Sequence, residues 1–273
     1  MDGIVACETL YTELPAVAPD AEIRYVPQWY HEFPIHTPES AQGHAALQEQ
    51  IDDLEAAGVD RVLVIYHDPD ALVGLQTESV PLLVYRGLDC IDLQLNGEAD
   101  GPGGERKAGA TYYLTRGWID VAVDSYKVYR AYAGDLDDLV AEFEAARAAI
   151  PGMRVSWPNS EKVQQAQARS EGMRTDPAAL VRTVLDSYRH VVLVDTGHLE
   201  PFHHDYAEAV RTFFAEIVPE EGPRDVDLEV VPGTLERLER IVGTPDAVPD
   251  VLALDPGEPV PEESGFRTGP QHP

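Results

Sequence analysis

Short apolar runs recur along the chain, and longer stretches with helical spacing separate them. Seven of these runs are predicted to be strands: residues 3–7, 21–26, 61–66, 81–85, 190–195, 227–231 and 251–254. They are rich in Val, Ile and Leu, and most do not alternate strictly between apolar and polar positions. Both faces of such strands are expected to be covered, as in a parallel sheet.

The stretches between these runs carry apolar residues three or four positions apart, a spacing typical of helices that bury one face. The clearest patterns lie at 47–54, 136–143, 180–188, 207–217 and 235–241. Asp176 and Pro177 are expected to begin the third helix, and Thr234 is expected to cap the last. Strands alternating with helices predict an α/β protein with a mostly parallel sheet flanked by helices.

The length of 273 residues fits one large domain or two small ones. Residues 1–255 are predicted to form a single α/β domain. The two groups of strands, before and after a long helical middle, leave open an arrangement of two Rossmann-like lobes. Residues 96–110 and 151–173 are predicted loops, with a short strand at 153–157 as an alternative. Because residues 256–273 are proline-rich and polar, they are predicted to form a disordered tail.

The net charge of the chain limits the classes of partner that are expected. The chain carries 49 acidic and 20 basic residues, a formal net charge of −29. Such a surface repels nucleic acid and anionic lipid, so neither is expected as a partner. Acids spread over the whole chain favour a halophilic protein from a high-salt cytosol, where carboxylates stay hydrated and their repulsion is screened. An ordinary acidic protein is the alternative.

Three features predict a cytoplasmic location. No apolar run approaches the roughly 20 residues of a membrane helix. The N-terminus enters a strand pattern directly, without the basic segment of a secretion signal. The 2 cysteines do not make a disulfide framework.

Side chains with ligand or acid–base chemistry follow several predicted strands. Because the carboxyl ends of parallel strands meet at one edge of a sheet, where ligands bind in open α/β folds, these side chains are expected to collect there. They are Cys7 and Glu8, His67, Asp89 and Cys90, and Asp195.

Cysteine and histidine at one edge suit zinc or another transition metal, which prefers sulfur and nitrogen ligands. Cys90 is also expected in the first turn of a helix, where the positive helix end favours the thiolate. The alternative is that both cysteines pack in the core as small apolar residues. Cys7 and Cys90, with a histidine and a further O or N ligand, are therefore a candidate metal set, for which His67 and His36 are the available histidines. His36 is expected in a loop that leads back towards the sheet, and a solvated loop histidine is the alternative.

The segment ATYYLTRGWID, residues 110–120, is dense in aromatic side chains. Tyr112, Tyr113 and Trp118 are predicted to form a wall over a planar ligand, with Thr115 and Arg116 supplying polar contacts. Asp195 is predicted as a further cofactor-binding residue. Alternatively, the rings seat a helix on the sheet. The chain has neither the lysine spacing of a P-loop nor the G-x-S-x-G motif of α/β-hydrolases.

Four segments, ACETLYTEL, IHTPE followed by LQEQID, RGLDCIDLQL and TYYLTRGWI, stand in this order along the chain. They are similar to successive motifs of a prokaryotic domain-of-unknown-function family, number sixteen thirty-eight, and the similarity extends from residue 4 to about residue 258. The family has no settled activity. Its members, common in archaea and anaerobic bacteria, often lie among genes for corrinoid-dependent methyl transfer. The resemblance therefore implies a corrinoid or a methyl-transfer protein as a ligand or partner.

The resemblance also implies positions for the family's polar residues. Members usually carry a third cysteine after the strand at 61–66, where this chain has Pro69. Either His67 replaces that ligand or the site has lost one ligand. The positions implied are Cys7, Glu8, His36, Asp89 and Cys90.

Three functions follow from these alternatives. The first is an enzyme in which a metal holds a thiolate or water nucleophile, with Glu8 or Asp89 as the proton-transfer partner. The second is a non-catalytic protein that carries a metal or corrinoid for another protein. In the third, the cysteines only pack and there is no site. A small-molecule ligand or a methyl-transfer protein is the partner expected for the first two.

We expect the melting temperature to rise steeply as potassium chloride is raised into the molar range. Salt screens the repulsion among the 49 acids, because the Debye length falls from about 10 Å at 0.1 M to about 3 Å at 1 M. Thermal unfolding followed by circular dichroism measures this dependence. A melting temperature that stays flat or falls with added salt would refute the halophile hypothesis.

Overall fold

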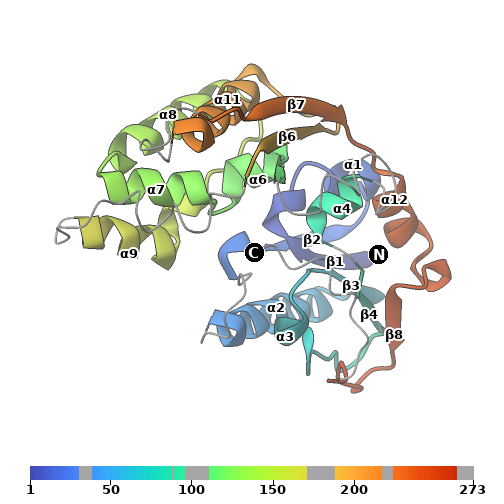
Figure 1. Ribbon diagram of the computed structural model, residues 1–273. Helices are drawn as coiled ribbons and strands as arrows, with labels where there is room; N and C mark the ends of the chain where they lie inside the picture. The colour runs from blue at the N-terminus through green and yellow to red at the C-terminus, as the bar shows by residue number, and fades with distance from the viewer. Residues whose placement is uncertain (31–38, 88, 96–110, 171–187, 217–223, 263–273) are drawn as a thin grey trace. The chain divides into compact units, whose positions relative to one another are not determined.

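The computed structural model describes residues 1–30, 39–87, 89–95, 111–170, 188–216 and 224–262. The chain divides into two compact units, whose segments Figure 1 colours by residue number. Unit 1 comprises Met1–Gly97 and Thr234–His272, and unit 2 comprises Glu98–Gly233. Each unit has its own sheet with helices around it, so the predicted α/β class is confirmed. No helix in the described residues is both long enough and apolar enough to cross a membrane.

Unit 1 is built on a five-stranded sheet with the strand order β2-β1-β3-β4-β8. β1 (Asp2–Cys7) lies between β2 (Glu22–Val26) and β3 (Arg61–Ile65), and all three are parallel. β4 (Leu82–Tyr85) continues the parallel part, and β8 (Val251–Leu254) pairs antiparallel with β4 at the edge. All five strands coincide with apolar runs that predict them, and the mostly parallel arrangement is confirmed.

Helices cover both faces of this sheet. α2 (Glu39–Ala56) packs on one face through Leu47, Ile51 and Leu54, which are fully buried as their spacing predicts. The opposite face is covered by α1 (Leu14–Val17), α4 (Cys90–Gln94) and α12 (Glu236–Gly243). The remaining elements are α3 (Pro69–Leu72), η1 (Glu8–Leu10), η2 (Gln28–Tyr30) and η5 (Pro245–Ala247).

The chain returns to unit 1 at Thr234. The Thr234 hydroxyl oxygen accepts a hydrogen bond from the Glu236 N–H at 3.2 Å. The N-cap position of α12 is Leu235, which has no side-chain cap, so the prediction that Thr234 caps this helix is wrong by one residue. Leu238 and Ile241 of α12 are buried in the same cluster as Leu93 of α4. α12 therefore packs against α4, which begins at Cys90.

Unit 2 contains a parallel three-stranded sheet in the order β5-β6-β7. Its strands are β5 (Thr111–Leu114), β6 (His190–Asp195) and β7 (Asp227–Pro232). The predicted strands at 190–195 and 227–231 and the predicted helices at 136–143 and 207–216 are confirmed. Residue 217 and most of the helix predicted at 180–188 lie outside the described residues. The helical elements are α6 (Arg116–Val121), α7 (Ser125–Ala133), α8 (Leu136–Ala149), η3 (Trp157–Asn159), α9 (Glu161–Ser170) and α11 (Pro201–Glu216).

Three sequence predictions in unit 2 differ from the structure. The loop predicted at 151–173 contains the helix α9, so that prediction is wrong over Glu161–Ser170. β5 is a strand that the apolar runs did not predict, because its four residues carry two tyrosines and do not form a long aliphatic run. The alternative strand at 153–157 is wrong, because Trp157 begins the 3-10 turn η3. Pro158 has no N–H to donate to a neighbouring strand, and the fully buried Trp157 ring packs on Phe143 instead, with centroids 5.1 Å apart.

The predicted disordered tail also needs a correction over its first residues. Residues 256–262 are described, and Val260 is 2% exposed within the core cluster on the α2 face. The backbone of Val260 exchanges hydrogen bonds with Leu75 and Gly74, and the Gly257 N–H donates to Thr77. The buried Val260 side chain and these backbone hydrogen bonds tie residues 256–262 to unit 1. The rest of the predicted tail, 263–273, lies outside the described residues.

Two truncations test the docking of residues 256–262. Ending the chain after Leu254 should lower the free energy of unfolding by about 2 kcal/mol or more, because burial of a valine side chain alone contributes about 1.5–3 kcal/mol. Ending it after Glu262 should change stability little. Urea unfolding in molar potassium chloride compares the two. Equal stability of both truncated chains would contradict the docked arrangement.

Candidate functional site

In unit 1, β2 is added on one side of β1 and β3 on the other side. The chain therefore changes the direction in which it adds parallel strands to the sheet, and this switch point lies between β1 and β3. In open α/β sheets, ligands bind outside the carboxyl ends of the strands at such a switch point. Cys7 ends β1 and Glu8 follows it, while His67 follows β3 by two residues. The structure therefore brings these three predicted site residues to the carboxyl ends of the two strands that flank the switch point.

Cys7 is a buried thiol. Its side chain is 3% exposed and packs with Val5, Tyr66 and residues of α2. The Thr9 hydroxyl donates a hydrogen bond to the Cys7 sulfur at 3.1 Å. Burial raises the pKa of the Cys7 thiol to about 11, so the group is protonated at neutral pH unless a metal displaces the proton.

Cys90 has a different setting. It is the first residue of α4, so its expected place in the first turn of a helix is confirmed. The Asp89 carboxylate caps this helix, because its Oδ1 accepts hydrogen bonds from the N–H groups of Ile91 and Asp92 at 3.0 and 2.9 Å. The Cys90 side chain is half-buried. Asp89 thus has a capping role that the sequence analysis did not predict, and its proton-transfer role stays a prediction.

The two cysteines pack against opposite faces of the sheet. Side chains alternate between the faces along a strand, and Cys7 shares the α2 face with Val5. Cys90 packs against the cluster on the other face, which contains Leu93 of α4 and Tyr85 of β4. A site containing both sulfurs would therefore have to lie beyond the carboxyl ends of the strands. The shared two-cysteine site stays a prediction.

His67 contacts the turn that leads to Cys90. Its Nδ1 lies 3.2 Å from the Gly87 carbonyl oxygen, in the turn between β4 and α4. Since a carbonyl oxygen only accepts, Nδ1 must donate the proton, and the lone pair of the neutral ring resides on Nε2. The structure thus links two of the predicted metal ligands through a residue three positions before Cys90.

Asp68 follows β3 directly after His67, so the sequence also places it at this edge of the sheet. Its Oδ1 accepts hydrogen bonds from the N–H groups of Asp70 and Ala71, so it caps α3. Its Oδ2 is buried without a hydrogen-bond partner in the described part of the chain. Burial raises the pKa of the Asp68 carboxyl above its usual value. The Asp-Pro pair after a strand was the signal for the cap, whereas the burial follows only from the packing.

Within the residues that the structure describes, no three His, Cys, Asp or Glu side chains gather closely enough to hold a metal ion. His36 lies outside those residues. Glu8 is buried in η1, directly after Cys7. The four-ligand metal site and the proton-transfer role of Glu8 therefore stay predictions.

The residues predicted to contact a cofactor in unit 2 have identifiable local roles. The Tyr112 ring packs edge-on against Tyr188 and Phe214, with centroids 5.2 and 5.0 Å away. The Thr115 hydroxyl caps α6 by accepting the Trp118 N–H at 3.1 Å, and the Trp118 side chain is half-buried. These contacts match the alternative in which the segment seats a helix on the sheet.

Asp195 shapes the turn that follows β6. Its Oδ1 accepts the Gly197 N–H at 2.7 Å, and Gly197 has a φ of +86°, which favours glycine. Contact of Tyr112, Thr115, Trp118 and Asp195 with a cofactor stays a prediction.

A buried polar network beside this segment was also missed. His203 Nδ1 accepts the Glu200 N–H at 2.8 Å at the start of α11, so Nε2 carries the proton and donates to Oδ1 of Asp120 at 3.2 Å. Arg116 Nε lies 3.5 Å from the other oxygen of Asp120. Both Asp120 and His203 are fully buried. Because one carboxylate is shared by two donors, the network ties the start of α11 to α6.

Lys127 is the second buried group of unit 2. Its ammonium donates to the carbonyl oxygens of Ile119 and Ala122, at 2.6 and 2.7 Å, and so closes the C-terminal end of α6. The nearest carboxylate oxygen, on Asp124, is 3.7 Å away. Burial lowers the pKa of Lys127 from 10.5 to about 8. The rings of Phe143, Trp157 and Tyr206 surround the ammonium, with centroids at 5.1, 5.3 and 5.4 Å.

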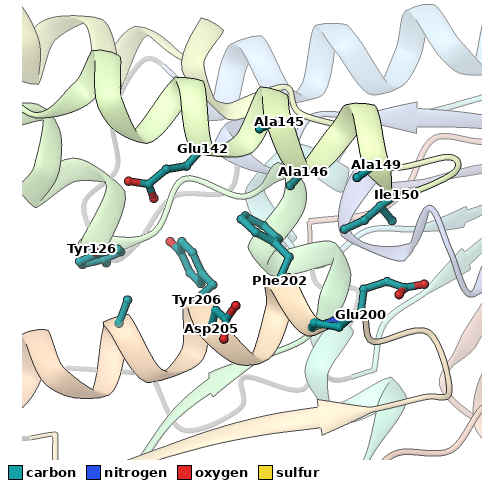
Figure 2. A pocket seen from close by; sticks show the side chains of 12 residues that line it. Tyr126, Glu142, Ala145, Ala146, Ala149, Ile150, Glu200, Phe202, Asp205 and Tyr206 are labelled. Atoms are coloured by element: carbon teal, nitrogen blue, oxygen red, sulfur yellow. The ribbon is translucent and has the colours of Figure 1, made fainter.

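A groove of about 640 Å³ lies between α8 and α11 in unit 2. Figure 2 shows Phe202 and Tyr206 rising from α11 towards Ala145, Ala146 and Ala149 of α8. Glu142, Glu200 and Asp205 add carboxylates to its walls. None of the residues predicted from the sequence as site residues lines this groove.

Comparison with known proteins places the chain in one family. The model of the family described as "Protein of unknown function (DUF1638)" matches residues 42–242. The resemblance stated from the sequence motifs is thereby confirmed. The match includes His67 and Cys90 and begins after Cys7 and His36. No curated protein and no solved structure matches the chain.

The buried lysine predicts a pH dependence of stability. Between about pH 8 and pH 10.5 the unfolded chain holds a proton on Lys127 that the folded chain has lost. Stability rises with pH wherever the unfolded state binds more protons than the folded state. We therefore compare the free energy of unfolding of the natural chain with that of Lys127→Met. The natural value minus the variant value should increase across this pH range. The slope should reach at most about 1.4 kcal/mol per pH unit.

Urea unfolding at several pH values measures this difference. Lys162→Met removes an exposed lysine and serves as the matched control, for which the difference should stay nearly constant. Parallel pH profiles of the natural chain and Lys127→Met would show that the lysine titrates as it does in water.

Proposed function

The chain belongs to the DUF1638 family, whose description assigns no activity, and we propose that the protein binds a transition-metal ion. The proposal is based on the geometry of unit 1. The site lies at the carboxyl edge of the five-stranded sheet. Nε2 of His67 and the sulfur of Cys90 are its ligands. Both residues lie within the part of the chain that the family model matches.

One observation carries this proposal: the hydrogen bond from Nδ1 of His67 to the Gly87 carbonyl. A histidine that ligates a metal usually donates its other ring N–H to a carbonyl or carboxylate, which fixes the tautomer and the ring orientation. Here the carbonyl belongs to the turn that precedes Cys90. One backbone segment therefore orients the imidazole ligand and presents the thiol ligand.

The chemistry of Cys90 fits the same metal class. The thiolate is the form that binds metal, and a place in the first turn of a helix favours it. Sulfur and imidazole nitrogen together suit zinc or another borderline metal. Asp89 holds the first turn of α4 through its carboxylate, so Cys90 has a defined backbone position.

The wider ligand set predicted from the sequence adds Cys7 and His36. For Cys7, burial, the hydrogen bond from Thr9 and the raised pKa favour the packing role, which is the second candidate. The resemblance to a family found among methyl-transfer genes makes a corrinoid or a methyl-transfer protein the partner class to examine. A bound metal would supply a Lewis acid there, with Glu8 or Asp89 as the predicted proton-transfer partner.

Elemental analysis of protein purified anaerobically in high salt tests the proposal. The natural chain should retain a transition metal, and Cys90→Ser and His67→Gln should each lose it while remaining folded. Added Co²⁺ should give a thiolate-to-cobalt absorption band that Cys90→Ser abolishes. The loss of affinity should exceed the roughly 10–100-fold that removal of an outer-shell partner causes.

His44→Gln is the matched control, because the Nδ1 of His44 also contacts a backbone carbonyl, that of Ala71 at 3.1 Å, but the residue lies on α2. It should leave metal content unchanged. Cys7→Ser should lower stability by about 1–3 kcal/mol, the cost of a buried hydroxyl that lacks a partner, and retain the metal if Cys7 only packs. Metal-free natural protein that also fails to bind Co²⁺ would refute the proposal.

A further inference from the structure

The turn between β4 and α4 is held by residues that lie some 150 positions later in the chain, in the segment that returns to unit 1. We propose that Arg237 and Asp250 of this segment are positioning residues for the Cys90–His67 site. Their contacts set the place of the turn, and the turn sets the direction of both ligands. The effect expected on metal affinity rests on the proposed function. The contacts themselves, and the effect expected on the reactivity of the Cys90 thiol, do not.

Two hydrogen bonds hold the turn from opposite sides. The Arg86 N–H donates to the Asp250 carbonyl at 2.7 Å, just before β8. The Gly87 carbonyl, one residue later, accepts from His67 at 3.2 Å. The backbone at Arg86 and Gly87 is therefore held between the histidine ligand and the segment that contains Asp250.

The turn also lies directly on the Tyr85 ring. A Cβ added at Gly87 would come within 2.0 Å of the Tyr85 hydroxyl oxygen, so only glycine allows this approach. Tyr85 is 2% exposed and belongs to the cluster against which Cys90 packs. A shift of the Tyr85 ring would therefore move the turn.

Arg237 connects these two supports. Its guanidinium lies over the Tyr85 ring, 5.8 Å from the centroid, and donates to Oδ2 of Asp250 at 2.8 Å. The side chains of Arg237 and Asp250 are only 13% and 15% exposed, so water competes weakly for this ion pair. One side chain on α12 thus holds both the ring beneath the turn and the residue that receives the Arg86 N–H.

The same segment braces the far end of α4. The Thr234 N–H donates to the Gln94 carbonyl at 2.7 Å. Leu238 and Ile241 of α12 belong to the same buried cluster as Leu93, and Cys90 packs against this cluster. The helix that starts at Cys90 is therefore held at its last turn, along its apolar face and at the turn before its first residue.

Arg237→Met tests this role, because methionine keeps an apolar stem but removes the guanidinium. Alkylation of Cys90 by iodoacetamide, measured on its peptide by mass spectrometry across a range of pH, should become about tenfold faster as the turn loosens. Affinity for Co²⁺ should fall by about 10–100-fold, as for loss of an outer-shell partner. Arg237→Lys keeps the charge without the planar fork and should recover part of both changes.

Two controls separate positioning from general destabilisation. Arg240→Met makes the same substitution at an exposed position of α12 and should change neither readout. Val59→Ala destabilises unit 1 in the connection that leads into β3, away from the turn, and should lower the melting temperature without changing Cys90 alkylation.

The outcomes for the two proposals are distinguishable. Faster alkylation of Cys90 in Arg237→Met, with no metal bound by any variant, would support positioning and refute the metal site. Unchanged alkylation and unchanged Co²⁺ affinity in a folded Arg237→Met would overturn the positioning role. If that variant does not fold, Asp250→Asn, which weakens the ion pair but keeps the backbone carbonyl, decides by the same two readouts.

Discussion

β1 is hydrogen-bonded on both sides, to β2 and to β3, and the other features of unit 1 depend on that central position. The β1 residues from Ile4 to Cys7 are apolar on both faces of the sheet, so both faces must be covered. α2 covers one face, and α1, α4 and α12 cover the other. The strict alternation of side chains then determines on which face each residue of β1 packs.

This alternation has a direct consequence for the two cysteines. Cys7 is held on the α2 face among buried side chains, while Cys90 belongs to a helix on the opposite face. From the sequence alone the two cysteines are equivalent candidates for a ligand, since each follows a predicted strand. In the folded chain only Cys90 combines a half-buried thiol with a helix start and a nearby histidine.

Unit 2 depends on buried charges as well as apolar packing. Lys127, Asp120, Asp124 and His203 are all at most 3% exposed, and each is hydrogen-bonded. The lowered pKa of Lys127 shows that burial outweighs its attraction to Asp124. Desolvation of such a network costs free energy. The network nevertheless leaves few alternative arrangements for α6, α7 and α11, because a shift of one helix would leave a buried charge without its hydrogen-bond partner. Removal of one member should therefore be more damaging than removal of an exposed acid.

The sequence by itself determined seven of the eight described strands, the helices α2, α8, α11 and α12, and the α/β class. Periodic burial of apolar residues is a local property that composition and spacing express directly. It also placed Cys90 at a helix start and identified the family through short motifs. β5 and the docked residues around Val260 were not predicted, because neither segment carries a long aliphatic run.

Which polar residues contact one another was decided by the tertiary structure alone. His67 reaches the turn before Cys90, and Arg237 and Asp250 support that turn from the end of the chain. Such contacts join residues up to about 160 positions apart, and their formation depends on strand order and on the return of the chain to unit 1, which no local pattern encodes.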